Sequence, residues 1–142
     1  MGMYMRRSMA MAAWALMIGA AAPVSRSEAQ LSRLIPTGKR PDGAGVLRVW
    51  TPEEYIANAG PSLERDGFFE REIGRKLERY GNVVHLMSAY DSKRTLSDPK
   101  PFARGVNSFQ LFFDGTRWWV VTIYWEAETP GNPIPAGLLF GK

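Results

Sequence analysis

Two long apolar segments, residues 102–113 and 117–126, constrain the fold of this chain more than any other feature. Asp114-Gly115-Thr116 joins them, and an Asp-Gly pair between two β-rich segments is typical of a tight hairpin turn. Eight of the 17 aromatic residues lie in these segments: Phe102, Phe109, Phe112, Phe113, Trp118, Trp119, Tyr124 and Trp125. Because large apolar groups fall on both faces, we expect this hairpin to be covered on both sides, by helices of the chain or by a second subunit.

A second hairpin is predicted around Gly81-Asn82. Phe69, Ile73 and Leu77 have a spacing that fits both a helix and a strand, and composition alone favours a helix over residues 68–80. The Gly-Asn pair and the β-branched and aromatic residues of segment 83–90 favour strands instead. We predict a long antiparallel hairpin, a choice that the family resemblance described below supports.

The segments around these hairpins carry turn and helix-start patterns. Residues 30–45 are rich in proline and glycine and predict an extended leader or loop, which a short strand over residues 46–50 follows. Thr51-Pro52-Glu53-Glu54 has the spacing of a capping box, so a short helix starts there, and Gly60-Pro61 is predicted to end it. Residues 91–101 are expected to form a connecting loop, and residues 128–142 an irregular tail.

The first 29 residues differ in kind from the rest. Arg6 and Arg7 precede an uncharged apolar run over residues 9–22, and small residues follow, which is the order of a secretory signal peptide. Cleavage after Ala29 would leave Gln30 as the first residue of a periplasmic or secreted protein. The alternative is that this run is a helix of the domain itself. The predicted organisation is a signal peptide (1–29), a leader loop and short strand (30–50) and a folded domain (51–142).

Charge and composition exclude several classes of function. Removal of residues 1–29 lowers the formal net charge from +4 to +2, and the remaining cations alternate with acids, as in Glu70-Arg71-Glu72. Nucleic-acid binding is therefore not expected, and membrane contact is expected only through the signal peptide before cleavage. The chain has no cysteine and a single histidine, so thiolate and multi-histidine metal sites are excluded. Phosphate loops, dinucleotide fingerprints and serine hydrolase motifs are absent, and no cofactor is expected.

The order of a short helix, a long hairpin, a loop and an aromatic hairpin resembles the nuclear transport factor 2-like superfamily, in particular its bacterial SnoaL-like members. The resemblance rests on residues 67–73, 81–85, 104–111, 117–121 and 129–135, which include Gly105-Val106-Asn107-Ser108-Phe109-Gln110-Leu111 and Arg117-Trp118-Trp119. It implies an α+β fold in which a curved antiparallel sheet wraps around helices as a cone with a pocket at its open end. Members include isomerases, dehydratases and polyketide cyclases, and also binding and assembly domains, so the fold does not fix the function.

The resemblance also implies two N-terminal helices that close the cone. Residues 30–50 are too short and too rich in proline and glycine to supply both. We therefore expect these helices to be missing, or the first to be replaced by the apolar run 9–22.

Polar residues within the apolar strands are the candidate pocket residues. His85 alternates with Val83 and Met87, and a lone histidine among apolar neighbours is more often a packed residue than a base. Buried amides and hydroxyls need partners, either one another or a ligand. The candidate pocket residues are His85, Asn107, Gln110, Thr122 and Tyr124, and the candidate acid/base residues near strand ends are Asp91 and Glu126. Alternation places Asn107 and Gln110 on opposite faces, and the sequence leaves open which of them faces the pocket.

Two functions follow as hypotheses. The first is a non-catalytic binding or assembly module that takes a small apolar ligand. It forms a homodimer through the aromatic sheet, because the adjacent Trp118 and Trp119 must point to opposite faces. The alternative is an isomerase, dehydratase or cyclase that uses His85 with Asp91 or Glu126 for acid/base catalysis on a small hydrophobic substrate.

Overall fold

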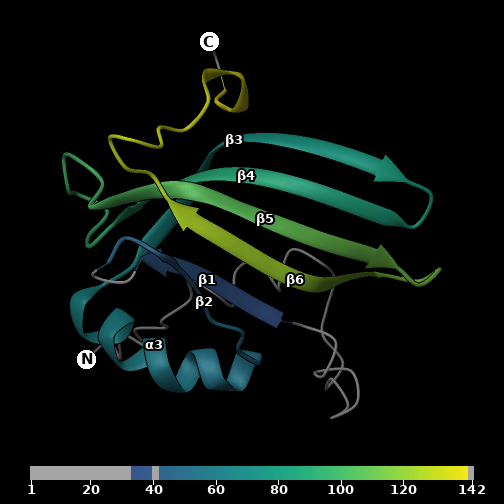
Figure 1. Ribbon diagram of the computed structural model, residues 1–142, viewed down its shortest axis with the longest axis horizontal. Coiled ribbons are helices and arrows are strands. Elements are labelled where there is room, and N and C mark those ends of the chain that lie inside the picture. The colour runs from purple at the N-terminus through teal and green to yellow at the C-terminus, as the bar shows by residue number, and fades with distance from the viewer. Residues whose placement is uncertain (1–32, 40–41, 141–142) are drawn as a thin grey trace, which may run out of the picture.

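The chain folds as one curved, six-stranded sheet with a helix on one side (Figure 1). The computed structural model describes residues 33–39 and 42–140. The strands are β1 (Arg33–Lys39), β2 (Gly45–Leu47), β3 (Phe69–Tyr80), β4 (Val83–Lys93), β5 (Ala103–Phe113) and β6 (Trp118–Ala127), with helix α3 (Pro52–Asp66) and the 3₁₀ helix η1 (Ala136–Leu138). They pair in the order β2-β1-β6-β5-β4-β3, and all pairs are antiparallel except β1 with β6. The predicted α+β class with a curved antiparallel sheet is confirmed.

Both predicted hairpins are present. Strands β3 and β4 pair from Phe69↔Lys93 to Tyr80↔Val83, and β5 and β6 pair down to Phe113↔Trp118. The turn glycines Gly81 and Gly115 have φ values of +53° and +101°, a region that glycine adopts without a steric penalty. The turns therefore set the register of the strand ends beside them. Farther from the turns the register shifts by one residue, between Glu72 and Gly74 in the β3–β4 pair and between Gln110 and Leu111 in the β5–β6 pair.

The N-terminal part of the sheet differs from the prediction. Residues 33–39 were expected in a leader loop, but they form β1, which pairs in parallel with β6 from Arg33↔Thr122 to Pro36↔Trp125. Local composition is a weak guide to strands, because pairing with a distant strand outweighs it. The apolar run 9–22 and its predicted role lie outside the described residues.

Two element boundaries also differ from the prediction. Strand β4 continues to Lys93, so Asp91 belongs to a strand and not to the connecting loop. Helix α3 begins as expected, since Thr51 Oγ1 accepts from the Glu54 amide at 3.2 Å and Glu54 Oε2 accepts from the Thr51 amide at 2.8 Å. It does not end at Gly60-Pro61 but at Asp66.

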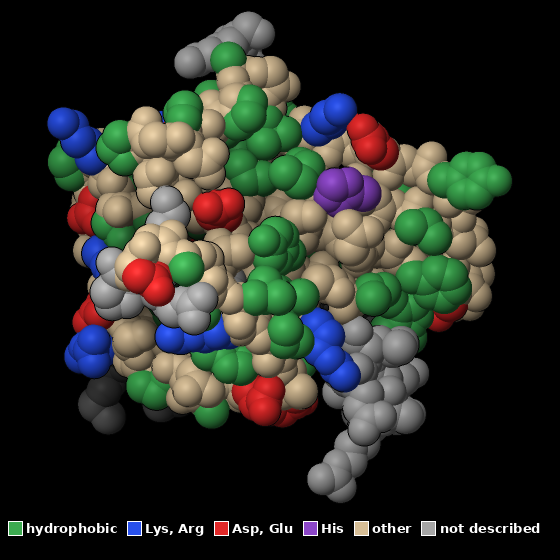
Figure 2. Space-filling model, viewed as in Figure 1, with side chains coloured by type: hydrophobic (Ala, Val, Ile, Leu, Met, Phe, Trp, Pro, Cys, Tyr) green, Lys and Arg blue, Asp and Glu red, His purple; other side chains and the backbone are tan. Residues whose placement is uncertain are grey.

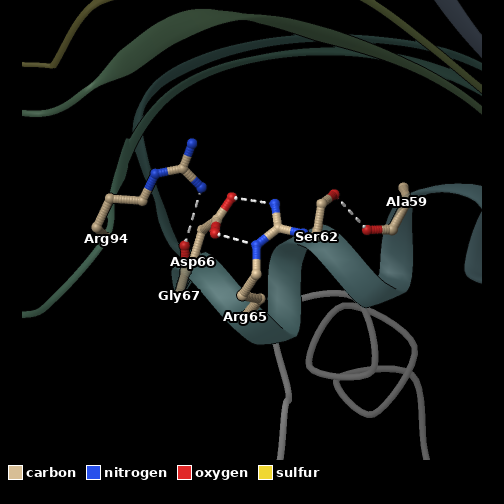
Figure 3. A network of polar contacts seen from close by, with 6 residues as sticks. All are labelled: Ala59, Ser62, Arg65, Asp66, Gly67 and Arg94. Atoms are coloured by element: carbon tan, nitrogen blue, oxygen red, sulfur yellow. Dashed lines mark hydrogen bonds and ion pairs between the residues drawn. The ribbon is translucent and has the colours of Figure 1, made fainter.

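Several polar contacts lie in the part of the helix that follows Pro61 (Figure 3). Ser62 Oγ donates to the Ala59 carbonyl at 2.9 Å, and Arg65 forms two bonds to Asp66, at 2.7 and 3.0 Å. Gly67, with φ +77°, then ends the helix, and its carbonyl accepts from Arg94 Nη1 at 3.2 Å. Proline has no backbone N–H and so removes one helical hydrogen bond, but the helix continues past Pro61 to Asp66.

The sheet has two faces with different coverings. The helix face carries an apolar cluster built from β4, β5 and β6, with Val84, Leu86 and Phe109 buried at its centre. Part of the tail face is covered by the C-terminal segment, whose Ile134 and Leu138 are buried against Ala89. Figure 1 shows α3 and this segment on opposite sides of the long strands. Within residues 33–39 and 42–140, no helix has the length and apolar character needed to cross a bilayer.

Candidate functional site

A cavity of about 170 Å³ lies on the helix face, between α3 and strands β3 to β6. It is smaller than the pockets of roughly 300–1,000 Å³ that hold drug-sized ligands, so it suits a small molecule. Its lining combines aromatic and aliphatic side chains with a few polar ones. The lining residues are Tyr55, Phe68, Glu70, Tyr90, Ser92, Ala103, Asn107, Phe109, Ile123 and Trp125.

Strand register explains why the polar residues of the cavity meet. Glu70 pairs with Ser92 across β3 and β4, and because side chains alternate along a strand, both point to the helix face. Asn107 lies one strand further along, on β5. The structure therefore places one carboxyl, one hydroxyl and one amide from three adjacent strands in the same small space.

Gly105 makes room for Tyr90 beside them. Tyr90 pairs with Gly105 across β4 and β5, and a Cβ atom at Gly105 would lie 2.5 Å from the Tyr90 hydroxyl oxygen and 2.8 Å from its Cζ atom. A glycine at this position thus lets the end of the tyrosine ring pack closely against the backbone of β5, and Tyr90 lines the cavity.

Glu70 is the central charged group of the cavity. Its carboxylate accepts from Asn107 Nδ2 and from Ser92 Oγ, each at 3.3 Å. Burial raises the pKa of Glu70 above its usual range, and the hydrogen bonds from Asn107 and Ser92 oppose that shift. A partly desolvated carboxyl of this kind can act as a counter-ion or exchange a proton with a ligand.

The phenols of the cavity stay protonated at neutral pH. Burial, assisted by the negative charge of Glu70, raises the pKa of Tyr90 to about 12. The same two causes raise the pKa of Tyr55. Both hydroxyls can therefore donate hydrogen bonds to a ligand.

Aromatic rings form the wall toward α3. Tyr55 meets Trp125 edge to face, with ring centroids 5.6 Å apart, and it lies 5.9 Å from the Trp50 ring. At the other end Phe68 packs edge to face against Phe102, at 6.2 Å. The helix thus brings Tyr55, the residue just after its capping box, over a pocket that the strands build.

Asn107 is the only one of the predicted pocket residues that lines this cavity. His85, Gln110 and Thr122 form one cross-strand row on the tail face, and Tyr124 lies opposite Ser108 on the same face. Figure 2 looks onto this face and shows the histidine (purple) with hydrophobic side chains (green) on both sides of it. The structure therefore divides the predicted set between two faces of the sheet.

His85 has a partner on the tail face. Its Nε2 atom lies 2.9 Å from Ser108 Oγ, in a hydrogen bond whose direction depends on the histidine tautomer. A second cavity, of about 260 Å³, lies nearby between the strands and the C-terminal segment, and Ser108, Tyr124 and Glu126 contribute to its lining.

The two predicted acid/base residues do not line the Glu70 cavity. Asp91 is 6% exposed and accepts two bonds from Arg71, at 2.8 and 2.9 Å. The Arg71 hydrogen bond holds the pKa of Asp91 below its usual range, which is the behaviour of a structural ion pair. Glu126 is exposed near the end of β6.

The sequence reasoning passed over Glu70, Ser92, Tyr55 and Trp125 as site residues. The alternation of Glu70 with Arg71 and Glu72 is typical of a solvated, charged face and gives no sign of a buried carboxyl at Glu70. The periodicity of β4 held the missing information, since Ser88, Tyr90 and Ser92 share the face of the buried Val84 and Leu86. A row of polar residues on an apolar face predicts a polar cavity or a buried network.

The described residues contain no group of three or more His, Asp or Glu side chains that could hold a metal ion.

Comparison with known proteins yields one likeness in fold. No family model matches the sequence, and no curated protein matches it. The structure is similar to the crystal structure of a nuclear transport factor 2-like (NTF2-like) protein of unknown function from Shewanella baltica, with a TM-score of 0.43 and 13% identity. The match covers 73% of this chain and 75% of that chain.

Proposed function

We propose that this protein binds a small, largely apolar molecule in the helix-face cavity. The observation that carries the proposal is the composition of that cavity: aromatic and aliphatic walls surround a few convergent polar groups, Glu70, Asn107 and Tyr90. Ligand sites have this composition, because apolar walls supply affinity while a few polar groups fix orientation.

A variant that fills the cavity tests this proposal. Ala103 is a half-buried lining residue at the start of β5, and Ala103→Phe would place a ring in the cavity. Ala57→Phe, on the exposed surface of α3, is the matched control. The three proteins are purified identically, and the small molecules that remain bound are extracted and identified by mass spectrometry. We expect a compound with the wild type and the control that is lost from Ala103→Phe; identical extracts from all three would contradict the proposal.

A second candidate function, acid/base catalysis, is favoured by one observation. Glu70 combines a raised pKa with a place in a cavity beside Asn107, as the general base of an isomerase, dehydratase or cyclase requires. In this alternative, Glu70 takes the role that the sequence assigned to His85 with Asp91 or Glu126.

Proton exchange provides a test that needs no known substrate. Wild-type protein and Glu70→Gln are incubated with cyclohexanone in D₂O, and loss of the α-proton signal is followed by NMR. Catalysis predicts faster exchange with the wild type than with Glu70→Gln or with buffer. Equal rates in all three samples would refute a role of Glu70 in proton abstraction from a ketone.

We also propose that the protein is exported, with residues 1–29 as its signal peptide. The basic, apolar and small-residue order of this segment supports the proposal. N-terminal sequencing of protein recovered from a secreting host should begin at Gln30. An intact Met1 on the mature protein would contradict cleavage.

A homodimer through the aromatic sheet remains part of the proposal. Phe112 and Tyr124, on the tail face, are 43% and 41% exposed, which is high for aromatic residues of a sheet. Sedimentation equilibrium of the purified protein should give twice the monomer mass, and Tyr124→Lys should restore the monomer. A wild-type protein that stays monomeric at high micromolar concentration would contradict this proposal.

A further inference from the structure

Among the buried and half-buried carboxylates of the described sheet and its edges, Glu70 is set apart by the lack of a basic partner. Three carboxylates on or beside the same strands are each paired with an arginine. The pairs are Asp91 with Arg71 at 2.8 Å, Glu72 with Arg75 at 2.7 Å and Glu128 with Arg104 at 3.0 Å. In the described part of the chain, Glu70 accepts only from the neutral donors Asn107 and Ser92, both at the longer distance of 3.3 Å.

The residues that line the cavity around Glu70 carry no positive charge. Its ten lining residues, all described, include no lysine, arginine or histidine. A carboxylate that is partly removed from water without a counter-charge is costly, and a cation supplied by a ligand would relieve that cost. The site is therefore electrostatically complementary to a cation.

The rings that surround the carboxylate suit a particular kind of cation. Tyr55, Phe68, Phe109 and Trp125 line the same cavity, and the faces of such rings attract ammonium groups, most strongly when water is excluded. Protein sites for hard metal ions usually combine several carboxylates, whereas Glu70 is the one carboxylate among the residues that line this cavity. Aromatic walls around one carboxylate are complementary to an organic ammonium ion.

We propose that the ligand of the helix-face cavity is an organic cation, a small molecule that carries an amine or quaternary ammonium group on an apolar body. Glu70 is its counter-ion, and Tyr55 and Trp125 pack against the cationic group and the carbon skeleton. The inference rests on the proposed function, because it names the ligand class of the same cavity. It also assigns Asn107 and Ser92 a positioning role, since they hold the carboxylate in place by hydrogen bonds.

A pair of probes that differ in charge and little in shape tests the inference. Benzylammonium and benzyl alcohol are titrated separately into wild-type protein, Glu70→Gln and Glu64→Gln, with binding followed by ¹H–¹⁵N NMR. Glu64 is an exposed residue of α3, so Glu64→Gln removes the same charge without changing the cavity. We expect benzylammonium to bind the wild type and Glu64→Gln alike, and Glu70→Gln about tenfold more weakly, as loss of a partly desolvated ion pair requires.

The possible outcomes separate the inference from the proposed function. If benzyl alcohol binds the cavity as tightly as benzylammonium, and Glu70→Gln leaves both affinities unchanged, the cation inference is overturned while small-molecule binding stands. If neither probe shifts any resonance of a cavity residue in the wild type, both the inference and the proposed binding site are overturned. Equal weakening by Glu64→Gln and Glu70→Gln would show only a long-range effect of net charge and would also overturn the role of Glu70.

Discussion

Substitution of Gly105 by alanine is the sharpest perturbation of the cavity that the structure suggests. An added Cβ would lie 2.5 Å from the Tyr90 hydroxyl oxygen, 2.8 Å from Tyr90 Cζ and closer still to the Glu126 carbonyl oxygen. Since the last of these atoms belongs to the backbone of β6, movement of the tyrosine alone cannot relieve the overlap. Forced contacts of this kind typically cost about 1–3 kcal/mol, and we expect Gly105→Ala to lower the free energy of unfolding by that amount.

Urea unfolding followed by tryptophan fluorescence measures this loss. Gly38→Ala in β1 is the control, because no atom of the described residues lies within 4 Å of its added Cβ. That change should leave stability unaltered or raise it by up to about 1 kcal/mol, since alanine restricts the unfolded chain. Adding Tyr90→Phe to Gly105→Ala removes the hydroxyl overlap and should recover part of the loss. A Gly105→Ala protein within about 0.5 kcal/mol of the wild type, the range of ordinary surface substitutions, would refute the close packing of Tyr90 over β5.

Three further predictions concern other parts of the chain. Gly74→Ala would place a Cβ 2.6 Å from Leu139 Cα and 2.7 Å from the Leu138 carbonyl carbon. It should therefore detach the C-terminal segment and speed the cleavage of that segment in limited proteolysis. Unchanged cleavage would contradict the docking of the segment on the sheet. Thr51→Ala removes the side-chain half of the capping box and should cost about 1 kcal/mol in urea unfolding, whereas Thr51→Ser should cost little. Because the folded state raises the pKa of Glu70 above the ordinary value of 4.5, it holds this proton more tightly than the unfolded state does. The free energy of unfolding should therefore fall as pH rises from about 4.5 to the folded-state pKa of Glu70. Thermal melts at a series of pH values measure this decline, and Glu70→Gln should remove the part that Glu70 causes. An identical pH profile for both proteins would count against the burial of Glu70.

The sequence predicted the parts of the fold that local patterns determine. Gly81-Asn82 and Asp114-Gly115 mark turns, and Thr51-Pro52 marks a helix start, because each acts through residues close in sequence. Strand β1 could not be found in this way. Its residues Arg33–Lys39 owe their conformation to pairing with β6, almost 90 residues later in the chain.

The site was harder to predict than the fold. Asn107 could be identified as a polar residue in an apolar strand, but the side of the sheet that forms the cavity depends on where α3 packs. Glu70 lies in a segment with alternating charges, and only the register of β3 against β4 sets it apart from Arg71. His85 alternates with apolar residues, which made it a candidate pocket residue, but it lies on the tail face, where it contacts Ser108.

The most direct test of the central claim is a map of where a ligand binds on the wild-type protein. Benzylammonium is added stepwise to ¹⁵N-labelled protein, and the backbone resonances that shift are assigned. Ligand binding at the helix-face cavity predicts saturable shifts centred on Tyr55, Glu70 and Asn107, with Ser108 and Tyr124 unaffected. Shifts centred on Ser108 and Tyr124, or no saturable shift at all, would contradict the assignment of this cavity as the functional site.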